Sequence, residues 1–132
     1  DPDTQKLAQE CVKVRELAYC PYSNFKVGAA LLSDSGRKIY TGCNVENVAF
    51  GPSICAERTA IVKAVSSGET KFKSLAVCAQ KSDDSIVTPC GVCRQVISEF
   101  SKDRNIQIYC TRPDLTKKIM KTSLLELLPH RF

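Results

Sequence analysis

The chain has 132 residues, of which 43% are hydrophobic and 25% are charged, a composition typical of a globular protein large enough for one core. We therefore expect a single domain over residues 1–132. Because no apolar run could span a bilayer and no signal-peptide core is present, we also expect a cytoplasmic protein without membrane contact. The net charge of +5 is spread over scattered lysines and arginines, which argues against nucleic acid as a partner.

The first half of the chain predicts a helix, a pair of strands and a second helix. Their ranges are 3–19, 25–32, 38–43 and 53–67. Asp3 or Thr4 is the expected N-cap of the first helix, and Pro21 stops it. The first strand is apolar enough to be buried on both faces, and a Ser-Asp-Ser-Gly turn follows it. Ser53 is the expected N-cap of the second helix, whose apolar residues cover most of its circumference and predict a central, buried position.

The second half predicts two further strands with a helix between them, and then a short carboxy-terminal unit. The ranges are 75–79 for a strand, 88–100 for a helix, 106–110 for a strand, 118–120 for a candidate last strand and 123–129 for a capped helical turn. Thr88 is the expected N-cap of this third helix, with Pro89 as its first residue. A hairpin followed by helix–strand crossovers predicts an α/β fold, with a mixed sheet and helices on both faces. Gly28 and Gly42 are expected to mark close backbone approaches.

The eight cysteines predict a metal site more readily than disulfides, because no secretory signal is present. Cys78 and Cys110 lie in apolar runs, as small core residues do. The one histidine, His130, is third from the end, so a metal site must be built mainly from thiolates.

Two motifs near helix starts carry the chemistry. Cys55 precedes Glu57 by two positions, and Pro89 opens a Pro-Cys-x-x-Cys motif that contains Cys90 and Cys93. The helix dipole favours thiolate at such positions. Three sulfur ligands leave the fourth zinc position open for water, as in catalytic sites.

Three other interpretations of these cysteines remain open at this point. Cys90 and Cys93 could form a redox pair, although thioredoxin-like motifs lack a third partner. A structural site would need a fourth cysteine, for which the candidates are Cys43, Cys78 and Cys110. The three cysteines could also be unrelated core residues.

Across nearly the whole chain the sequence resembles the zinc-dependent cytidine deaminase family, in particular its small homotetrameric members that act on free nucleosides. The motifs that carry the resemblance are Tyr22-Ser23-x-Phe25-x-Val27-Gly28-Ala29-Ala30, Gly42-Cys43-Asn44-Val45-Glu46-Asn47, Ile54-Cys55-Ala56-Glu57-Arg58-Thr59-Ala60, Cys90-Gly91-Val92-Cys93-Arg94-Gln95 and Glu126-Leu127-Leu128-Pro129. The loop at residues 48–53 departs from the family pattern at Phe50 and Pro52, which bears on subunit contacts.

The resemblance implies a three-layer α/β/α sandwich around a five-stranded mixed sheet, a homotetramer and one Zn²⁺ per subunit. It implies hydrolytic deamination of cytidine and 2′-deoxycytidine to uridine and 2′-deoxyuridine, with release of ammonia, in pyrimidine salvage. Zinc-activated water attacks C4 of the cytosine ring, and Glu57 carries protons from water to ring N3 and to the leaving amino group.

The resemblance also assigns roles to particular residues. The zinc ligands are Cys55, Cys90 and Cys93, and the substrate-binding residues are Phe25, Asn44, Glu46, Ala56 and Phe132. Phe25 forms the wall of the pyrimidine pocket, and Ala56 together with the carbonyls near Thr88 and Pro89 faces the base edge. Phe132 reaches a neighbouring subunit's site.

Asn44 and Glu46 are two positions apart, so in an extended segment both face one side and can bond a ribose hydroxyl. The resemblance places Glu46 on the 3′-OH, and a buried Glu46 would leave little room for a 3′-phosphate. Three thiolates and a hydroxide outweigh the charge of zinc, so we hypothesise that Arg58 hydrogen-bonds the thiolates, with Arg94 as a weaker candidate.

Two alternative functions follow from the same motifs. One is a related three-cysteine deaminase that acts on a cytosine-nucleoside antibiotic, against which the intact Asn44-x-Glu46-Asn47 motif argues. The other is a non-catalytic, zinc-stabilised binding module.

Overall fold

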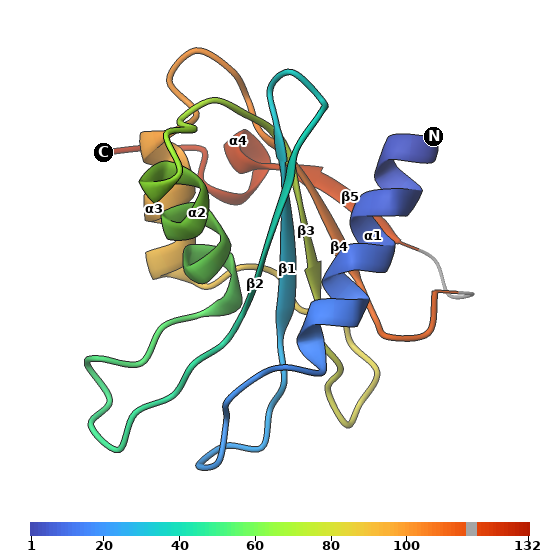
Figure 1. The fold of residues 1–132 in the computed structure, drawn as a ribbon, viewed down its shortest axis with the longest axis vertical. Coiled ribbons are helices and arrows are strands. Elements are labelled where there is room, and N and C mark those ends of the chain that lie inside the picture. Colours follow the sequence, from blue (N-terminus) through green and yellow to red (C-terminus); the bar gives the residue numbers. More distant parts are fainter. Residues whose placement is uncertain (116–118) are drawn as a thin grey trace.

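The computed structural model describes residues 1–115 and 119–132, which form one mixed sheet between two layers of helices (Figure 1). The elements are α1 (Pro2–Arg15), β1 (Gly28–Ser33), β2 (Ile39–Cys43), α2 (Ala56–Ser66), β3 (Phe72–Cys78), α3 (Gly91–Glu99), β4 (Gln107–Thr111), β5 (Met120–Ser123) and α4 (Leu124–Leu127). No helix in these ranges has the length and apolarity to cross a membrane.

The strand order within the described residues is β2-β1-β3-β4-β5. β3 and β4 are parallel, with α3 as the crossover between them, and the other three pairs are antiparallel. Every residue of β1 is buried, because β1 lies inside the sheet with helices over both faces. The predicted five-stranded α/β/α sandwich is confirmed.

Two hydrophobic cores lie on opposite faces of the sheet. Leu7 and Cys11 of α1 pack against Ala30 and Ala76 on one face. On the other face, α2 and α3 cover the larger core, which includes Ile61. Figure 1 shows α1 on one side of the sheet and α2 and α3 on the other. Each large aliphatic side chain buried in this way stabilises the fold by about 1.5–3 kcal/mol.

Gly28 and Gly42 lie where helices press against the sheet, as predicted. A Cβ on Gly28 would come within 2.1 Å of the Cys11 carbonyl oxygen in α1, and one on Gly42 within 2.4 Å of the Ala60 nitrogen in α2. Real Cβ atoms do not approach other atoms so closely, so only glycine fits at either position.

The start of α1 differs from the prediction. Asp1, rather than Asp3 or Thr4, is the N-cap, because its carboxylate accepts the Asp3 amide at 3.0 Å and Pro2 occupies the first helical position. The α-helix also ends at Arg15 rather than at residue 19, because the amides of the next three residues donate to the carbonyls three residues earlier, as in a 3₁₀-helix.

The predicted N-caps Ser53 and Thr88 are wrong. The helices α2 and α3 begin two residues later, with Cys55 and Cys90 as N-caps that make no side-chain capping bond. Ser53 Oγ instead accepts the Asn47 amide at 2.9 Å, and Thr88 Oγ1 accepts a guanidinium N–H at 2.9 Å. Both hydroxyls are therefore used inside loops.

The prediction of a fully buried second helix is also only partly right. Buried residues of α2 include Ala60 and Ala64, but Val62 is 51% exposed. The helix therefore has one solvent-facing side in the single chain.

The strand boundaries differ from the predicted ranges. β2 and β4 differ by one residue, and β3 spans Phe72–Cys78 rather than 75–79. β1 begins at Gly28 rather than residue 25, because residues 25–27 are held mainly by side chains, with one backbone bond from the Asn44 amide to the Val27 carbonyl. The last strand is Met120–Ser123 rather than 118–120, and Lys118 lies outside the described residues. Ser123 ends this strand and caps α4 as predicted, since its Oγ accepts the Glu126 amide at 3.3 Å.

Candidate active site

Two helix starts bring three cysteines together. Cys55 and Cys90 have extended backbone at the N-caps of α2 and α3, and Cys93 lies in the first turn of α3. Their sulfurs lie within 4.8 Å of one another, and the Sγ atoms of Cys55 and Cys90 are 3.9 Å apart. Within residues 1–115 and 119–132, this is the one such group of three potential metal ligands.

This sulfur set fits a zinc ion. Zinc–thiolate bonds of about 2.3 Å in a tetrahedron place two sulfurs roughly 3.8 Å apart, close to the observed 3.9 Å. Cys93 is buried and Cys90 is exposed, so the cluster reaches from the core to the surface. The predicted ligands are therefore in one place, and a tetrahedral ion held by three sulfurs retains a fourth position.

The surroundings of Cys55 favour its thiolate form. A hydrogen bond from Cys93 and the guanidinium of Arg58 lower the pKa of Cys55, and the amino-terminal dipole of α2 acts in the same direction. Arg58 Nη2 donates to the Cys55 sulfur at 3.3 Å, which confirms the predicted contact. The same contact raises the pKa of Arg58, so this side chain remains a cation.

Glu57 is buried beside the sulfurs. Glu57 is only 4% exposed and is the second residue of α2. Burial raises the pKa of its carboxyl to about 7, and the negative charge of Cys55 adds to this effect. A carboxyl with a pKa near neutrality can both accept and donate a proton. Because Glu57 is buried, it is not a solvated carboxylate on the helix surface.

Cys55, Cys90 and Glu57 line a cleft of about 580 Å³, and the buried Cys93 is not among its lining residues. The described residues that line it are Phe25, Val27, Asn44, Glu46, Phe50, Gly51, Ser53, Ile54, Cys55, Ala56, Glu57, Arg58, Val77, Val87, Thr88, Cys90 and Val92. Most exposed lining atoms are apolar, as is usual in sites for small molecules. Four of the five predicted substrate-binding residues are thus gathered here.

Four apolar valines of this cleft were not predicted as site residues from the sequence. Val27, Val77, Val87 and Val92 come from four separate segments, and nothing in their local sequence distinguishes them from core residues. Phe50 also lines the cleft although it is 96% exposed. The sequence singled out Phe50 for subunit contacts rather than for the cleft, and a large aromatic residue in a loop was the available signal.

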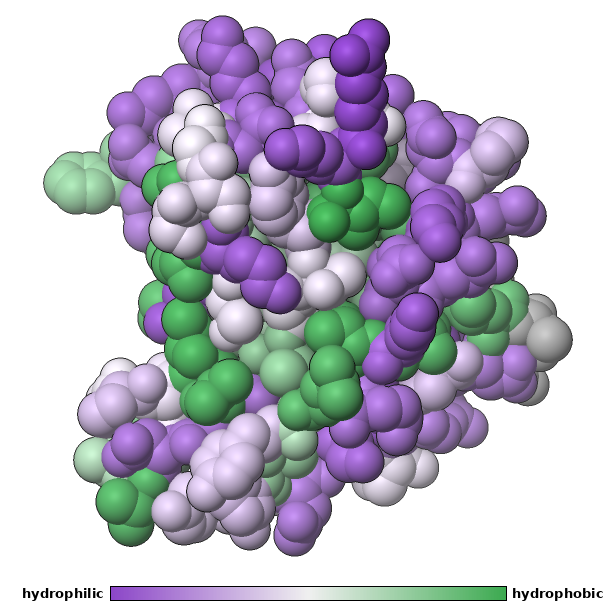
Figure 2. Space-filling view, viewed as in Figure 1, coloured by the Kyte–Doolittle hydropathy of each residue, from purple (hydrophilic) through white to green (hydrophobic). Residues whose placement is uncertain are grey.

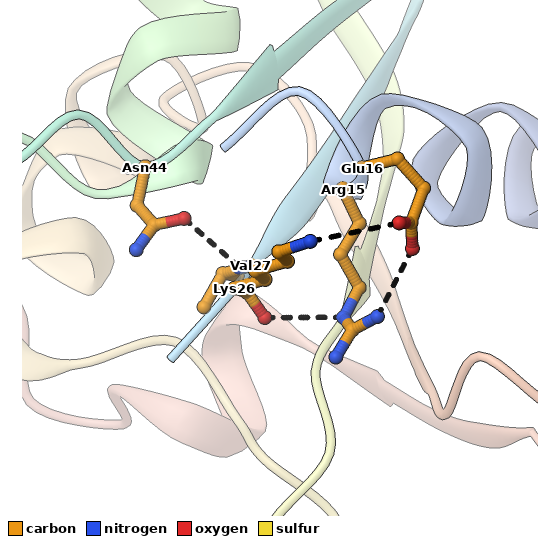
Figure 3. Close-up of polar contacts among 5 residues, drawn as sticks. All are labelled: Arg15, Glu16, Lys26, Val27 and Asn44. Carbon is orange, nitrogen blue, oxygen red and sulfur yellow. Dashed lines mark hydrogen bonds and ion pairs between the residues drawn. The ribbon is translucent and has the colours of Figure 1, made fainter. Parts of the chain in front are cut away.

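Asn44 is buried and holds the segment that carries Phe25. Its Nδ2 donates to the Phe25 carbonyl at 2.8 Å, and its Oδ1 accepts the Val27 amide at 2.9 Å. Figure 3 shows the second of these contacts. The side chain therefore forms part of the frame of the pocket as well as its lining.

Glu46 differs from the prediction, because it is partly exposed rather than buried. Its carboxylate accepts the Tyr22 and Ser23 amides, each at 3.1 Å, and the Ser23 hydroxyl. These bonds, led by that of the hydroxyl, lower the pKa of Glu46. Steric exclusion of a 3′-phosphate by burial is therefore not supported.

Three other predicted residues have different positions. Phe132 is fully exposed at the chain end and is absent from the cleft of its own chain. Arg94 does not bond a sulfur among the described contacts; it donates to the carbonyls of Pro89 and Leu127 at 2.7 and 2.9 Å. The Pro89 carbonyl, predicted to face the base edge, therefore accepts a hydrogen bond from Arg94, whereas Thr88 lines the cleft.

The fold and the site together define a zinc-binding α/β enzyme with a buried carboxyl next to its metal ligands. A family model described as the cytidine and deoxycytidylate deaminase zinc-binding region matches residues 2–110. The chain therefore belongs to this deaminase family.

Individual relatives agree with this assignment. The cytidine deaminase of Sporosarcina psychrophila is 50% identical over 130 residues, which cover 98% of this chain and 91% of the relative. A crystal structure of cytidine deaminase from Burkholderia pseudomallei matches with a TM-score of 0.87 and 40% identity, over 97% of this chain and 98% of the other. Blasticidin-S deaminase of Bacillus cereus is 30% identical over 112 residues, covering 80% and 76% of the two chains.

Proposed function

We propose that this protein is a zinc-dependent cytidine deaminase that converts cytidine and 2′-deoxycytidine to uridine and 2′-deoxyuridine and releases ammonia. The observation that carries the proposal is the buried Glu57 beside three clustered sulfurs in an apolar cleft. Cys55, Cys90 and Cys93 would hold one Zn²⁺, which supplies a nucleophilic water near neutral pH.

Glu57 moves the protons of the reaction. Its carboxylate accepts a proton from the attacking water and delivers it to ring N3 as the new C4–O bond forms. It then transfers the remaining hydroxyl proton to the amino group, so that the C4–N bond breaks and ammonia leaves. Water and cytidine are thereby converted to uridine and ammonia with no other reactant, and the carboxylate is regenerated.

The other cleft residues bind and orient the nucleoside. Phe25 forms a wall against the pyrimidine ring, and Ala56, at the first position of α2, has a backbone N–H without an intrahelical partner that can bond the base. Asn44 and Glu46 lie on the same cleft and bind the ribose hydroxyls, with Glu46 on the 3′-OH.

Charge at Glu46 favours free nucleosides over polynucleotides. Glutamate is ordinarily ionised at neutral pH, and the hydrogen bonds that lower the pKa of Glu46 act in the same direction, so its carboxylate repels a phosphate at the ribose 3′ position. Charge, rather than burial, therefore disfavours a 3′-phosphate at Glu46, which is partly exposed.

Arg58 offsets the negative charge of the sulfurs. Three thiolates reduce the ability of zinc to acidify water, and a cation that donates to the Cys55 sulfur counteracts this effect. Arg58 is therefore proposed to tune the metal rather than to contact the substrate.

The proposal includes a homotetramer in the cytoplasm that serves pyrimidine salvage. Several large apolar side chains are exposed in the single chain: Val45, Val48, Phe50, Val62 and Phe132. Figure 2 shows hydrophobic side chains gathered over the α2 side of the face in view. Such exposure supports a subunit interface, and Phe132 is proposed to reach a neighbouring site. Light scattering that gives a monomer would contradict this part.

A second candidate is deamination of a different cytosine nucleoside, which the similarity to blasticidin-S deaminase supports. The deciding experiment measures kcat/KM for cytidine, 2′-deoxycytidine, blasticidin S and cytidine 3′-monophosphate, from the absorbance change and from ammonia release. We expect the two free nucleosides to be the best substrates. A preference for blasticidin S would favour the second candidate, and no turnover by zinc-loaded protein would favour a binding module.

A further inference from the structure

The segment directly before β1, residues 25–27, carries Phe25 into the cleft but belongs to no strand. On one side Asn44 holds it through its amide group, which bonds Phe25 and Val27. The Asn44 backbone N–H also donates to the Val27 carbonyl at 3.2 Å. Three hydrogen bonds thus fix this side of the segment.

The carbonyl of Lys26 points the other way, because successive peptide groups of an extended chain face opposite sides. On that side β3 pairs with β1 only from Gly28 onward, where Gly28 is opposite Cys78. Arg15 supplies the missing partner, since its Nε donates to the Lys26 carbonyl at 3.2 Å. Figure 3 shows Arg15 and Asn44 on opposite sides of this short segment.

Arg15 is well placed for this contact. It is the last residue of α1, and its side chain is only 18% exposed. The helix end is pressed against the sheet, because a Cβ on Gly28 would lie 2.8 Å from the Arg15 nitrogen. Glu16 accepts Arg15 Nη1 at 3.3 Å and lies 3.7 Å from Lys26 Nζ. The ion pairs of the exposed Glu16 add little stability. The hydrogen bond from Arg15 to the Lys26 carbonyl is therefore the contact that holds the segment.

We propose that Arg15 is a positioning residue of the substrate pocket. It holds the Lys26 carbonyl and thereby keeps Phe25 and the Asn44 amide in their binding arrangement, an inference that rests on the proposed function. Without this donor, the segment keeps its contacts on one side only. The three sulfurs and Glu57 belong to other elements, α2, α3 and their N-caps, and make no hydrogen bond with Arg15 or Lys26 among the described contacts. We therefore expect weaker substrate binding with the chemical step preserved.

The test compares Arg15→Met, which retains the aliphatic stem, with Lys13→Met, which removes the same charge from an exposed position in the same helical turn. A hydrogen bond from a charged group corresponds to about 10- to 100-fold in an equilibrium, and partial exposure reduces this. We therefore expect Arg15→Met to raise the KM for cytidine about 5- to 20-fold, with kcat within about twofold and unchanged zinc content. Lys13→Met and Glu16→Gln should resemble the unsubstituted protein, and Arg15→Lys should be intermediate.

A second measurement separates positioning from a general structural role. In the zinc-loaded protein without substrate, amide hydrogen exchange at Val27 should become at least about fivefold faster in Arg15→Met, while exchange at Leu75 of β3 stays unchanged. A role in global stability would instead accelerate both amides and lower kcat and zinc content together.

Unchanged KM in Arg15→Met overturns the proposal, and so does a raised KM with unchanged exchange at Val27. If the unsubstituted protein does not turn over cytidine, the proposed function fails. The exchange rates of Val27 then decide alone whether Arg15 holds the segment.

Discussion

Replacement of the Glu57 carboxyl by an amide tests the chemistry most sharply among the single substitutions. Glu57→Gln keeps the size of a side chain that is 4% exposed in the core beside the sulfurs, so the fold and the zinc site should persist. General acid–base catalysis contributes about 10²- to 10⁴-fold, which corresponds to about 3–5 kcal/mol of transition-state stabilisation. We expect kcat to fall by at least that factor, with one zinc per chain retained.

The assay is the absorbance change from cytidine to uridine, paired with metal analysis and thermal unfolding of the same samples. Glu99→Gln, which changes an exposed carboxylate at the end of α3, is the matched control and should keep full activity. Near-normal turnover by zinc-loaded Glu57→Gln would remove Glu57 from the proton-transfer role. Loss of zinc in this variant would show instead that the carboxyl supports the metal site.

The pH dependence of stability offers an independent check on the same residue. In the metal-free protein, burial raises the pKa of Glu57 to about 7, above its value in the unfolded chain. The unfolded chain therefore releases this proton first, and ionised Glu57 destabilises the fold increasingly as the pH rises from about 5 to 8. Glu57→Gln should make unfolding less dependent on pH in this window, and an unchanged dependence would contradict the raised pKa.

Three further substitutions probe the frame of the site. Gly42→Ala should lower the free energy of unfolding by about 3 kcal/mol, because its Cβ would lie 2.4 Å from the Ala60 nitrogen; a denaturant midpoint equal to that of the unsubstituted protein would contradict this. Arg58→Gln removes the donor to Cys55 and should weaken zinc binding and move the acidic limb of the pH–rate profile to higher pH, so unchanged values of both would refute its role. Asn44→Ala should raise the dissociation constant for uridine about tenfold or more, since the contacts before β1 are lost, and calorimetry that shows equal binding would exclude this role.

The cluster of Cys55, Glu57, Cys90 and Cys93 could be predicted because it depends on short motifs, each of which lies within a few residues of the sequence. The spacing within each motif and the expected helix starts place the side chains. The predicted helix starts were two residues too early. A hydroxyl such as Ser53 Oγ can bond a loop amide as readily as a helix amide, so it does not always mark an N-cap. Sequence alone does not show which partner is nearer.

Contacts between distant segments could not be predicted in the same way. Glu46 accepts amides 23 and 24 residues earlier in the chain, and this contact determines its exposure and its pKa. Similarly, the strand predicted from residue 25 begins at Gly28, because Asn44 and Arg15 replace the strand partners of Lys26 and its neighbours. Such bonds depend on tertiary packing, which the local pattern does not contain.

The most direct test of the account measures metal content and cytidine turnover on one preparation of the unsubstituted protein. Cys55, Cys90 and Cys93 gather their sulfurs within 4.8 Å of one another, and Glu57 lies in the same cleft. The account predicts one Zn²⁺ per chain, release of one ammonia per uridine formed, and loss of activity when a chelator removes the metal. Zinc-loaded protein that releases no ammonia from any cytosine nucleoside would contradict it.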